Sequence, residues 1–299
     1  MKTIAVIPKN TTHVYWKAIE AGAREGAIEA GVKMIWKGSL KEDDPAQQVQ
    51  IVERFISEGV DGIVLAPIDD TALQSPCRRC DAERNPCGDF RFAAQGRARQ
   101  GLCQHGIDQQ PPRRGEMAGE QLGKLLNGKG KVVLFRFKEG SASTGQREAG
   151  FLEAIKKFPN IQVIADNRYS GTTARESQSS ALKMLNKLKE ADGIFCPTEP
   201  STFGMLSALK RNGLAGSKKL VGFDPSQGLM EGLRKDEIQA LVAQNPKRMG
   251  HEAVKALVAK MRGETVPTVI ETGAAVITKG NLDTPEIQAL LAGLFPVFA

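Results

Sequence analysis

Short apolar runs alternate along the chain with longer segments whose apolar positions recur every three or four residues. The first three runs, Ile4–Pro8, Lys33–Trp36 and Gly62–Pro67, have the length of buried strands. Between them, Trp16–Gly31 and Pro45–Glu58 have the apolar spacing of amphipathic helices. Because strands and helices alternate, this part of the chain is predicted to form a parallel sheet with helices on both faces.

The same alternation returns after Gly115. The expected strands are Lys131–Phe135, Gln162–Ala165, Gly193–Cys196, Leu220–Asp224 and Gln239–Gln244. The expected helices are Glu116–Leu126, Thr144–Phe158, Thr172–Leu188, Ser201–Asn212, Leu229–Arg234 and Arg248–Arg262, and Thr268–Val276 is expected to be an extended crossover. The chain is therefore predicted to fold as two similar α/β halves.

The pattern fails in a window from about Gln74 to Arg114, where two further strands are due. A loop of this length inside a compact domain is uncommon. The cysteines of the window, with its one histidine, suggest zinc, but their spacing fits no standard zinc finger, so we expect no metal. A disulfide between the first two cysteines is a further alternative. These residues are Cys77, Cys80, Cys87, Cys103 and His105.

Codon degeneracy offers an explanation for the window. Asn85–Arg91 can be encoded so that reading one nucleotide later gives Ile-Pro-Val-Val-Ile-Phe-Asp, a buried strand that ends in an aspartate. The same shift can turn Gly101–Gln110 into Asp-Phe-Val-Ser-Met-Ala-Ser-Thr-Asn-Asn. We therefore hypothesise that residues 74–114 are a frameshifted segment, of natural origin or from a sequencing error, between in-frame regions.

Composition is that of an ordinary soluble globular protein, with 41% apolar and 25% charged residues, and 299 residues suggest roughly two domains. The net charge is +7, but no long basic run or nucleic-acid motif accompanies it. No apolar run approaches the roughly 20 residues that cross a bilayer. Met1–Thr3 leads straight into a strand, so the protein is expected to be cytoplasmic or a mature form without its leader.

Catalytic signatures are poor. The sequence has no Gly-x-Gly-x-x-Gly loop, Walker loop or Gly-x-Ser-x-Gly elbow. Its three histidines, His13, His105 and His251, are far apart in the sequence, which argues against a catalytic triad. We therefore expect a binding protein that is not an enzyme and needs no cofactor.

Polar residues follow several expected strands, and ligands of open α/β sheets bind beyond the carboxyl ends of strands. Asp224 stands at such an end, Arg147 lies early in the helix after another strand, and Thr198 and Gln244 follow or end two more. Each can hydrogen-bond a ligand, and a guanidinium can form two parallel bonds. The alternatives stay open: Asp224 also suits a turn or a helix cap, and Arg147 a solvated helix.

The loop after the first strand, from Thr11 to Trp16, contains Tyr15 and Trp16. Aromatic rings stack on the apolar faces of sugars and nucleobases. Since the chain has only two Trp and two Tyr, one of each at this strand end favours a binding role. The alternative is that both start the following helix and pack inward.

With these features the chain resembles the type I periplasmic sugar-binding proteins, the ribose-binding group of ABC-transporter receptors. The resemblance covers nearly everything outside the window. It rests on Gln146–Phe151, Phe203–Leu209, Val221–Asp224 and Ala243–Pro246. It implies two doubly wound parallel-sheet domains joined by three crossover hinge segments, with the ligand in the cleft between them.

The resemblance also implies roles for single residues. Aromatic residues would stack on the sugar, and Arg147, Asp224 and Gln244 would bind its hydroxyls. Thr198 stands where the family often has Asn, and Tyr169 matches an aromatic residue in the loop after Gln162–Ala165. The family's other aspartate has no in-frame counterpart and reappears only in the shifted sequence. The implied ligand-binding residues are Tyr15, Trp16, Arg147, Tyr169, Thr198, Asp224 and Gln244.

The expected function is that of a periplasmic, monomeric receptor that closes about its hinge on a monosaccharide, a ribose-like pentose or a hexose, and delivers it to a membrane-embedded ABC permease. The first lobe would be residues 1–113 with 245–273, and the second 114–244 with 274–299. If the window is real protein, we expect irregular structure at Cys77–Arg114, the loss of two strands and one ligand carboxylate, low stability, and weak or absent sugar binding.

Two alternatives differ in class. The effector core of a LacI-type transcription regulator shares the fold, but it needs a helix-turn-helix before Ile4, where none is found. The other alternative is an enzyme or sensor, or a receptor, whose ligand is a nucleoside, a nucleobase or an autoinducer such as a furanone.

Overall fold

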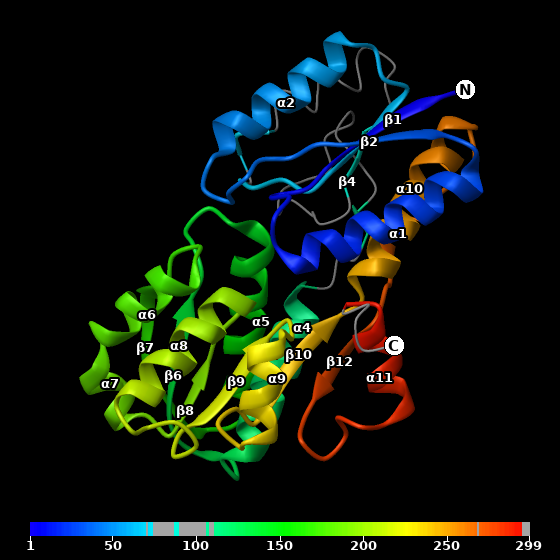
Figure 1. Cartoon of the computed structure of the whole chain (residues 1–299). Helices are drawn as coiled ribbons and strands as arrows, with labels where there is room; N and C mark the ends of the chain where they lie inside the picture. The colour runs from blue at the N-terminus through cyan, green and yellow to red at the C-terminus, as the bar shows by residue number, and fades with distance from the viewer. Residues whose placement is uncertain (70, 74–86, 90–105, 108–110, 268, 295–299) are drawn as a thin grey trace. The chain divides into compact units, whose positions relative to one another are not determined.

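The structure, a computed structural model, describes residues 1–69, 71–73, 87–89, 106–107, 111–267 and 269–294 (Figure 1). The chain divides into two units. Unit 1 is Met1–Gln109, Asn245–Gly273 and Leu290–Ala299, and unit 2 is Gln110–Gln244 with Ala274–Ala289. The chain therefore passes between the units after Gln109, Gln244, Gly273 and Ala289, one passage more than the three expected.

The additional passage lies in α11 (Pro285–Ala292), since the division falls between Ala289 and Leu290. The sequence assigned everything after residue 273 to the second lobe. Instead, the segment that begins at Leu290 belongs to unit 1. Gly293 approaches α10 of that unit, because a Cβ built on it would lie 3.8 Å from the Cβ of Lys247.

Unit 1 is built on a six-stranded sheet with the order β11-β5-β4-β3-β1-β2, and every strand pair in it is parallel. Residues of β3 are all buried, as expected for a central parallel strand. The strands are β1 (Thr3–Ile7), β2 (Lys33–Trp36), β3 (Gly62–Leu65), β4 (Cys87–Asp89), β5 (Gly106–Ile107) and β11 (Val269–Ile270).

Two strands of this sheet fall in the anomalous window, where irregular structure and two missing strands were expected. That expectation is wrong at β4 and β5, because both pair in register with their neighbours. Both are short, and β5 extends over Gly106–Ile107 alone. Of the residues singled out in the window, Cys77, Cys80, Cys103 and His105 lie outside the described residues.

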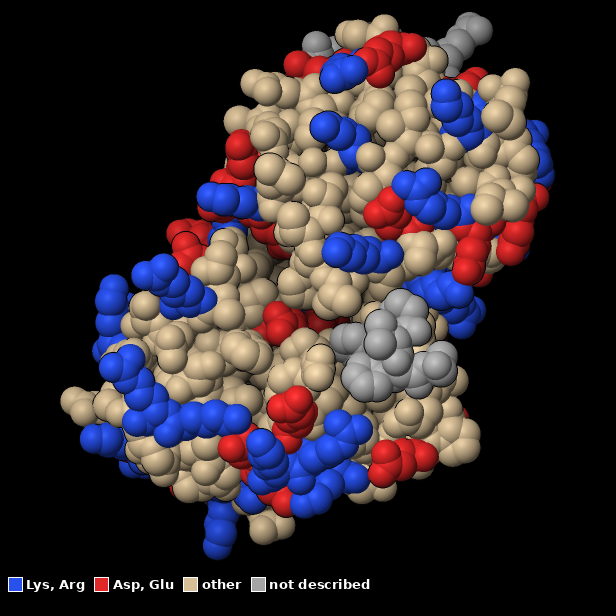
Figure 2. Space-filling view, viewed as in Figure 1, with Lys and Arg blue, Asp and Glu red and all other residues tan. Residues whose placement is uncertain are grey.

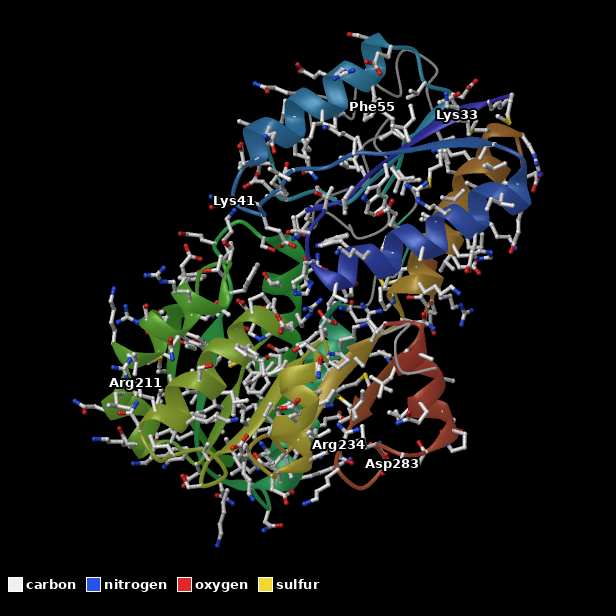
Figure 3. The ribbon with its side chains drawn as sticks, in the orientation of Figure 1. Lys33, Lys41, Phe55, Arg211, Arg234 and Asp283 are labelled. Carbon is white, nitrogen blue, oxygen red and sulfur yellow. The ribbon has the colours of Figure 1, made fainter. Side chains whose placement is uncertain are left out.

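Helices cover both faces of the unit 1 sheet. In Figure 1, α2 (Pro45–Ser57) lies on one face, and α1 (Val14–Ala30) and α10 (Pro246–Met261) lie together on the other. Phe55 of α2 lies between the helix and the strands, where it joins a buried apolar cluster with Ile63 and Leu65 (Figure 3). Asp44 caps α2, its side chain accepting a hydrogen bond from the Gln47 amide.

Unit 2 has a sheet of the same size with the order β12-β10-β9-β8-β6-β7. Its edge strand β12 runs antiparallel to β10, whereas the other pairs are parallel. The predicted doubly wound sheet is thus present with one antiparallel edge. The strands are β6 (Lys129–Arg136), β7 (Asn160–Tyr169), β8 (Gly193–Phe195), β9 (Lys219–Phe223), β10 (Ala240–Gln244) and β12 (Ala274–Ile277).

Alternation along β9 shows how both faces of this sheet are covered. Val221 and Phe223 join the apolar cluster that contains side chains of α4 and α5. Gly222, between them, points to the other face, where a Cβ would lie 2.2 Å from the Thr202 methyl carbon of α8. The helices of unit 2 are α4 (Pro111–Leu125), α5 (Ala142–Lys156), α6 (Ala174–Leu182), α7 (Leu185–Glu190), α8 (Glu199–Arg211) and α9 (Gln227–Arg234).

Several element boundaries differ from the predicted ones. The expected helix Thr172–Leu188 is two helices, α6 and α7, which break at Lys183 and Met184. The expected strand Gln162–Ala165 is the longer β7, whose last residue is Tyr169. The structure therefore places Tyr169 in a strand, where its backbone is in register with Arg136 of β6, and not in a loop.

Glycine lets helices of both units pack backbone to backbone. In unit 1, a Cβ on Gly22 of α1 would lie 1.8 Å from the Lys247 carbonyl oxygen of α10. In unit 2, a Cβ on Gly115 of α4 would lie 1.8 Å from the Arg147 carbonyl oxygen of α5. Such distances are far below van der Waals contact, so the backbones meet where a side chain has no room.

Charges are mixed on the surface. Figure 2 shows Lys and Arg interspersed with Asp and Glu on the visible face. Exposed ion pairs such as Lys131–Glu190 and Lys157–Glu120 are of a kind that adds little to stability. Among the helices in the described residues, none has both the length and the apolar character to span a membrane.

Candidate functional site

Arg147 connects the ends of two neighbouring strands in unit 2. It lies in the second turn of α5 with 2% of its surface exposed. One Nη1 hydrogen bond, 2.5 Å long, reaches the Pro197 carbonyl just beyond β8, and the guanidinium carbon lies 3.6 Å from the centre of the Phe223 ring at the end of β9. The carbonyl and the cation–π contact hold this charge at the carboxyl edge of the sheet.

Asp224 and Gln244 meet at the same edge. Asp224 directly follows β9, and Gln244 is the last residue of β10, the next strand of the sheet. The Gln244 Nε2 donates a hydrogen bond of 2.6 Å to the Asp224 Oδ1. The structure thus places Arg147, Asp224 and Gln244, which are apart in the sequence, at one edge of the unit 2 sheet.

Arg114 joins this group, and the sequence reasoning missed it. It lies in the first turn of α4, is buried, and donates from Nη1 to the Gln244 Oε1 at 2.6 Å. It is the last residue of the anomalous window, where the pattern had ceased to predict elements. A helix beginning at Pro111 was the signal that could have found it, since Pro is favoured in the first turn.

Thr198 lies beside the group but acts as a helix cap. It is the N-cap of α8, and its side chain and that of Ser201 form a reciprocal capping box. Thr202 donates to the Thr198 carbonyl at 2.7 Å. Thr198 thus follows Pro197, whose carbonyl binds Arg147, and caps the start of α8.

Tyr169 lies away from these residues. It ends β7, the edge strand of the unit 2 sheet, and β6 and β8 lie between β7 and β9. The residue is 42% exposed, and its carbonyl accepts a hydrogen bond from the Ser180 hydroxyl at 2.6 Å. The sequence alone could not place it, because the extra length of β7 moved it from a loop into a strand.

In unit 1, Tyr15 and Trp16 begin a helix instead of a loop, since α1 starts at Val14 after a His13 N-cap. Trp16 is only 2% exposed, and its ring is edge-on to that of Tyr15, with 5.4 Å between ring centres. The Tyr15 hydroxyl lies 3.4 Å from the Met249 sulfur of α10. In this structure both aromatic residues pack inside unit 1.

Glu42 connects the loops after β1 and β2. Its Oε1 accepts hydrogen bonds from the Trp16 indole nitrogen and from the Asn10 Nδ2, both at 2.9 Å. Asn10 in turn accepts from the backbone of His13 at 2.9 Å. Lys41, labelled in Figure 3, marks the position of the second loop. These bonds hold the Trp16 ring at the carboxyl edge of the unit 1 sheet.

One carboxylate beside Arg147 is buried for structural reasons. Glu148 is 3% exposed, accepts from the Phe137 backbone amide at 2.9 Å and pairs with Arg136 at 2.8 Å. Burial raises the pKa of Glu148 above its ordinary value, although the amide, Arg136 and Arg147 act against that rise. These two contacts tie α5 to the end of β6 and to the residue that follows it.

The donor set of unit 2 suits a hydroxylated ligand. Guanidinium and amide groups donate hydrogen bonds and a carboxylate accepts them, while the buried Phe223 ring lies under the Arg147 guanidinium. Within the described part of the chain, no three His, Cys, Asp or Glu side chains lie close enough to hold a metal ion. Two α/β units with such residues at a strand edge define the class of ligand-binding receptors.

The family follows from comparison with known proteins. Residues 4–265 match the model of the periplasmic binding protein domain, so the chain belongs to the periplasmic binding protein family. The chain is 24% identical over 284 residues to a D-ribose/D-allose-binding protein of Pseudomonas aeruginosa, covering 92% of this chain and 88% of that protein.

Solved structures agree with this assignment. An ABC transporter solute-binding protein from Agrobacterium vitis, bound to α-D-tagatopyranose, has a TM-score of 0.90 and 27% identity, covering 97% of this chain and 99% of that one. A carbohydrate transporter solute-binding protein from Agrobacterium radiobacter, in complex with D-arabinose, has a TM-score of 0.89 and 29% identity, covering 97% and 98%. The fold class inferred from the sequence is thereby confirmed.

Proposed function

We propose that this protein is the solute-binding receptor of an ABC importer and that its ligand is a monosaccharide. The observation that carries the proposal is the placement of Arg147, Asp224 and Gln244 at one edge of the unit 2 sheet, beside the carboxyl ends of β8, β9 and β10. The relatives named above support it, because their ligands are a ribose or allose, a tagatose and an arabinose.

In this proposal Asp224 accepts hydrogen bonds from sugar hydroxyls, and Arg147 donates to hydroxyl or ring oxygens. Phe223 holds the Arg147 guanidinium in place through its ring face. The receptor acts as a monomer in the periplasm and hands the sugar to a membrane permease without breaking a bond.

Thermal shift and calorimetric titration with D-ribose, D-allose, D-arabinose and D-tagatose test the proposal. Binding of a ligand to the native state alone raises the unfolding temperature. Arg147→Met should abolish the response to the sugar that binds, and Arg211→Met, at the exposed end of α8, should keep it. A response to nucleosides or autoinducers in the absence of any response to sugars would overturn the proposal.

A further inference from the structure

Arg114, Gln244 and Asp224 form one continuous chain of hydrogen bonds. Arg114 donates to the Gln244 Oε1 at 2.6 Å, and the Gln244 Nε2 donates to the Asp224 Oδ1 at 2.6 Å. Three elements contribute, namely α4, the end of β10 and the residue after β9. A charged side chain that is only 4% exposed is therefore directly bonded to a residue of the proposed sugar site.

The chemistry of the two ends decides which way the central amide points. A guanidinium only donates hydrogen bonds, and an ionised carboxylate only accepts them. The Gln244 amide between them satisfies both ends in one orientation, with its oxygen toward Arg114 and its nitrogen toward Asp224. The reversed amide would place NH2 against the guanidinium and oxygen against the carboxylate, so both bonds would be lost.

Packing fixes the position of Arg114. The neighbouring Gly115 lies so close to α5 that an added Cβ would be 1.8 Å from the Arg147 carbonyl oxygen. Helix α4 also contacts β8, β9 and β10. The backbone of Arg114 is therefore held by the packing of α4 against α5 and the sheet.

We propose that Arg114 is a positioning residue for sugar selectivity: it fixes the Gln244 amide, and the amide fixes how Asp224 is presented to the ligand. This inference rests on the proposed function. Asp224 then accepts from a ligand hydroxyl in one geometry. A sugar that has lost this hydroxyl, or carries a methyl ether there, is excluded.

The first test observes the Gln244 side-chain amide by nitrogen-15 NMR in the ligand-free protein, with the signal assigned by its absence in Gln244→Ala. In the parent protein and in Arg113→Met, a change at an exposed neighbour in the same turn, we expect two dispersed amide signals protected from water exchange. In Arg114→Met they should collapse toward free-glutamine positions and exchange at least tenfold faster. Unchanged signals in Arg114→Met would overturn the proposal.

The second test measures affinity by calorimetry for the sugar that binds, from D-ribose, D-allose, D-arabinose and D-tagatose, and for its deoxy analogues. Arg114→Met should weaken the sugar about tenfold and reduce its preference over the analogue. In Gln244→Ala the same change should add almost nothing, because the amide that Arg114 orients is gone. Additive losses would overturn the positioning role.

The two tests separate this inference from the proposed function. If none of these sugars binds, the proposed function fails and the role in selectivity falls with it, while the amide signals still show whether Arg114 orients Gln244. If sugars bind and the amide is indifferent to residue 114, only the inference fails.

Discussion

Asp224 combines a proposed binding role with an unusual backbone. Its φ is +54°, in the left-handed region that L residues rarely adopt and that Asp and Asn tolerate best. Its amide donates to the Val242 carbonyl at 2.9 Å, which holds the turn after β9 against β10. An aspartate at this position therefore suits the left-handed backbone and also supplies the carboxylate proposed to bind the ligand.

We predict that Asp224→Asn and Asp224→Val separate these two roles. Both should lose sugar affinity, by roughly tenfold or more for a charged hydrogen bond. Only the valine variant should also lose about 1–2 kcal/mol of unfolding free energy, because a β-branched residue is strained at positive φ. Urea denaturation measures the difference, and equal stabilities of the two variants would contradict the strain.

Glu148 predicts a pH dependence of stability. Because its pKa is raised in the folded state, the folded protein holds this proton more firmly than the unfolded chain does. Its contribution is fully present below the ordinary value of 4.5 and is lost as the pH rises through the raised pKa. The charged groups that face it are Arg136 and Arg147.

Urea denaturation of the parent protein and of Glu148→Gln, from about pH 4 to about pH 8, checks this sign. The glutamine keeps an acceptor for the Phe137 amide but does not titrate. The unfolding free energy of the parent should fall relative to the variant as the pH rises. A difference that grows in the opposite direction would show that Arg136 outweighs burial.

Among the elements, the glycine-packed helix pairs explain why α4 and α5 reach the strand edge together. Gly115 and Gly150 both lie at backbone crossings, where a Cβ would be 1.8 Å and 2.0 Å from carbonyl oxygens. These crossings place Arg114 and Arg147 at fixed points on neighbouring helices. The arrangement links helix packing directly to the placement of two guanidinium groups.

Gly115→Ala and Gly145→Ala form a matched pair of tests for this packing. Alanine at 115 meets the Arg147 backbone and should destabilise by about 1–3 kcal/mol through overpacking. Gly145 of α5 has nothing within 4 Å of a built Cβ, so alanine there should stabilise the protein by about 0.5–1 kcal/mol. Thermal unfolding that ranks the two variants in reverse order would refute the close crossing.

Hydrophobic periodicity was enough to predict most elements but not their ends. Strands such as β3 and β9 are visible as apolar runs because every residue in β3, and all but Lys219 in β9, is buried. The start of α1 was missed because a His13 N-cap places Tyr15 and Trp16 inside the helix. Caps, and contacts between distant segments such as Arg114–Gln244, leave no periodic signal in the sequence.

At the scale of the whole molecule, the anomalous window remains the main departure from a consistent sequence. In β4, Gly88 and Asp89 are residue types that are disfavoured in strands, and yet the strand lies between β3 and β5 in the sheet. A shift of one nucleotide would place Val-Val-Ile at Cys87–Asp89. The coding DNA tests the frameshift hypothesis, since codons that forbid the apolar sequence would end it.

A variant with Gly88→Val and Asp89→Ile should raise the unfolding temperature by a few degrees. The scale of strand propensities spans about 1 kcal/mol per residue, and both changes replace a disfavoured residue with a favoured one. Differential scanning calorimetry checks this, with Asp89→Asn as a control that removes the charge alone and should change little. A lower unfolding temperature in the double variant would show that the present residues suit β4 better than apolar ones.

The central claim is that two α/β units of the periplasmic binding protein family bind a monosaccharide. Calorimetric titration with D-ribose, D-allose, D-arabinose and D-tagatose, on the parent chain and on the Gly88→Val/Asp89→Ile variant, tests it most directly. We predict saturable binding of at least one sugar by the variant, weaker binding by the parent, and none by either after Arg147→Met. Absence of binding by both folded proteins, or binding that survives Arg147→Met, would contradict the account.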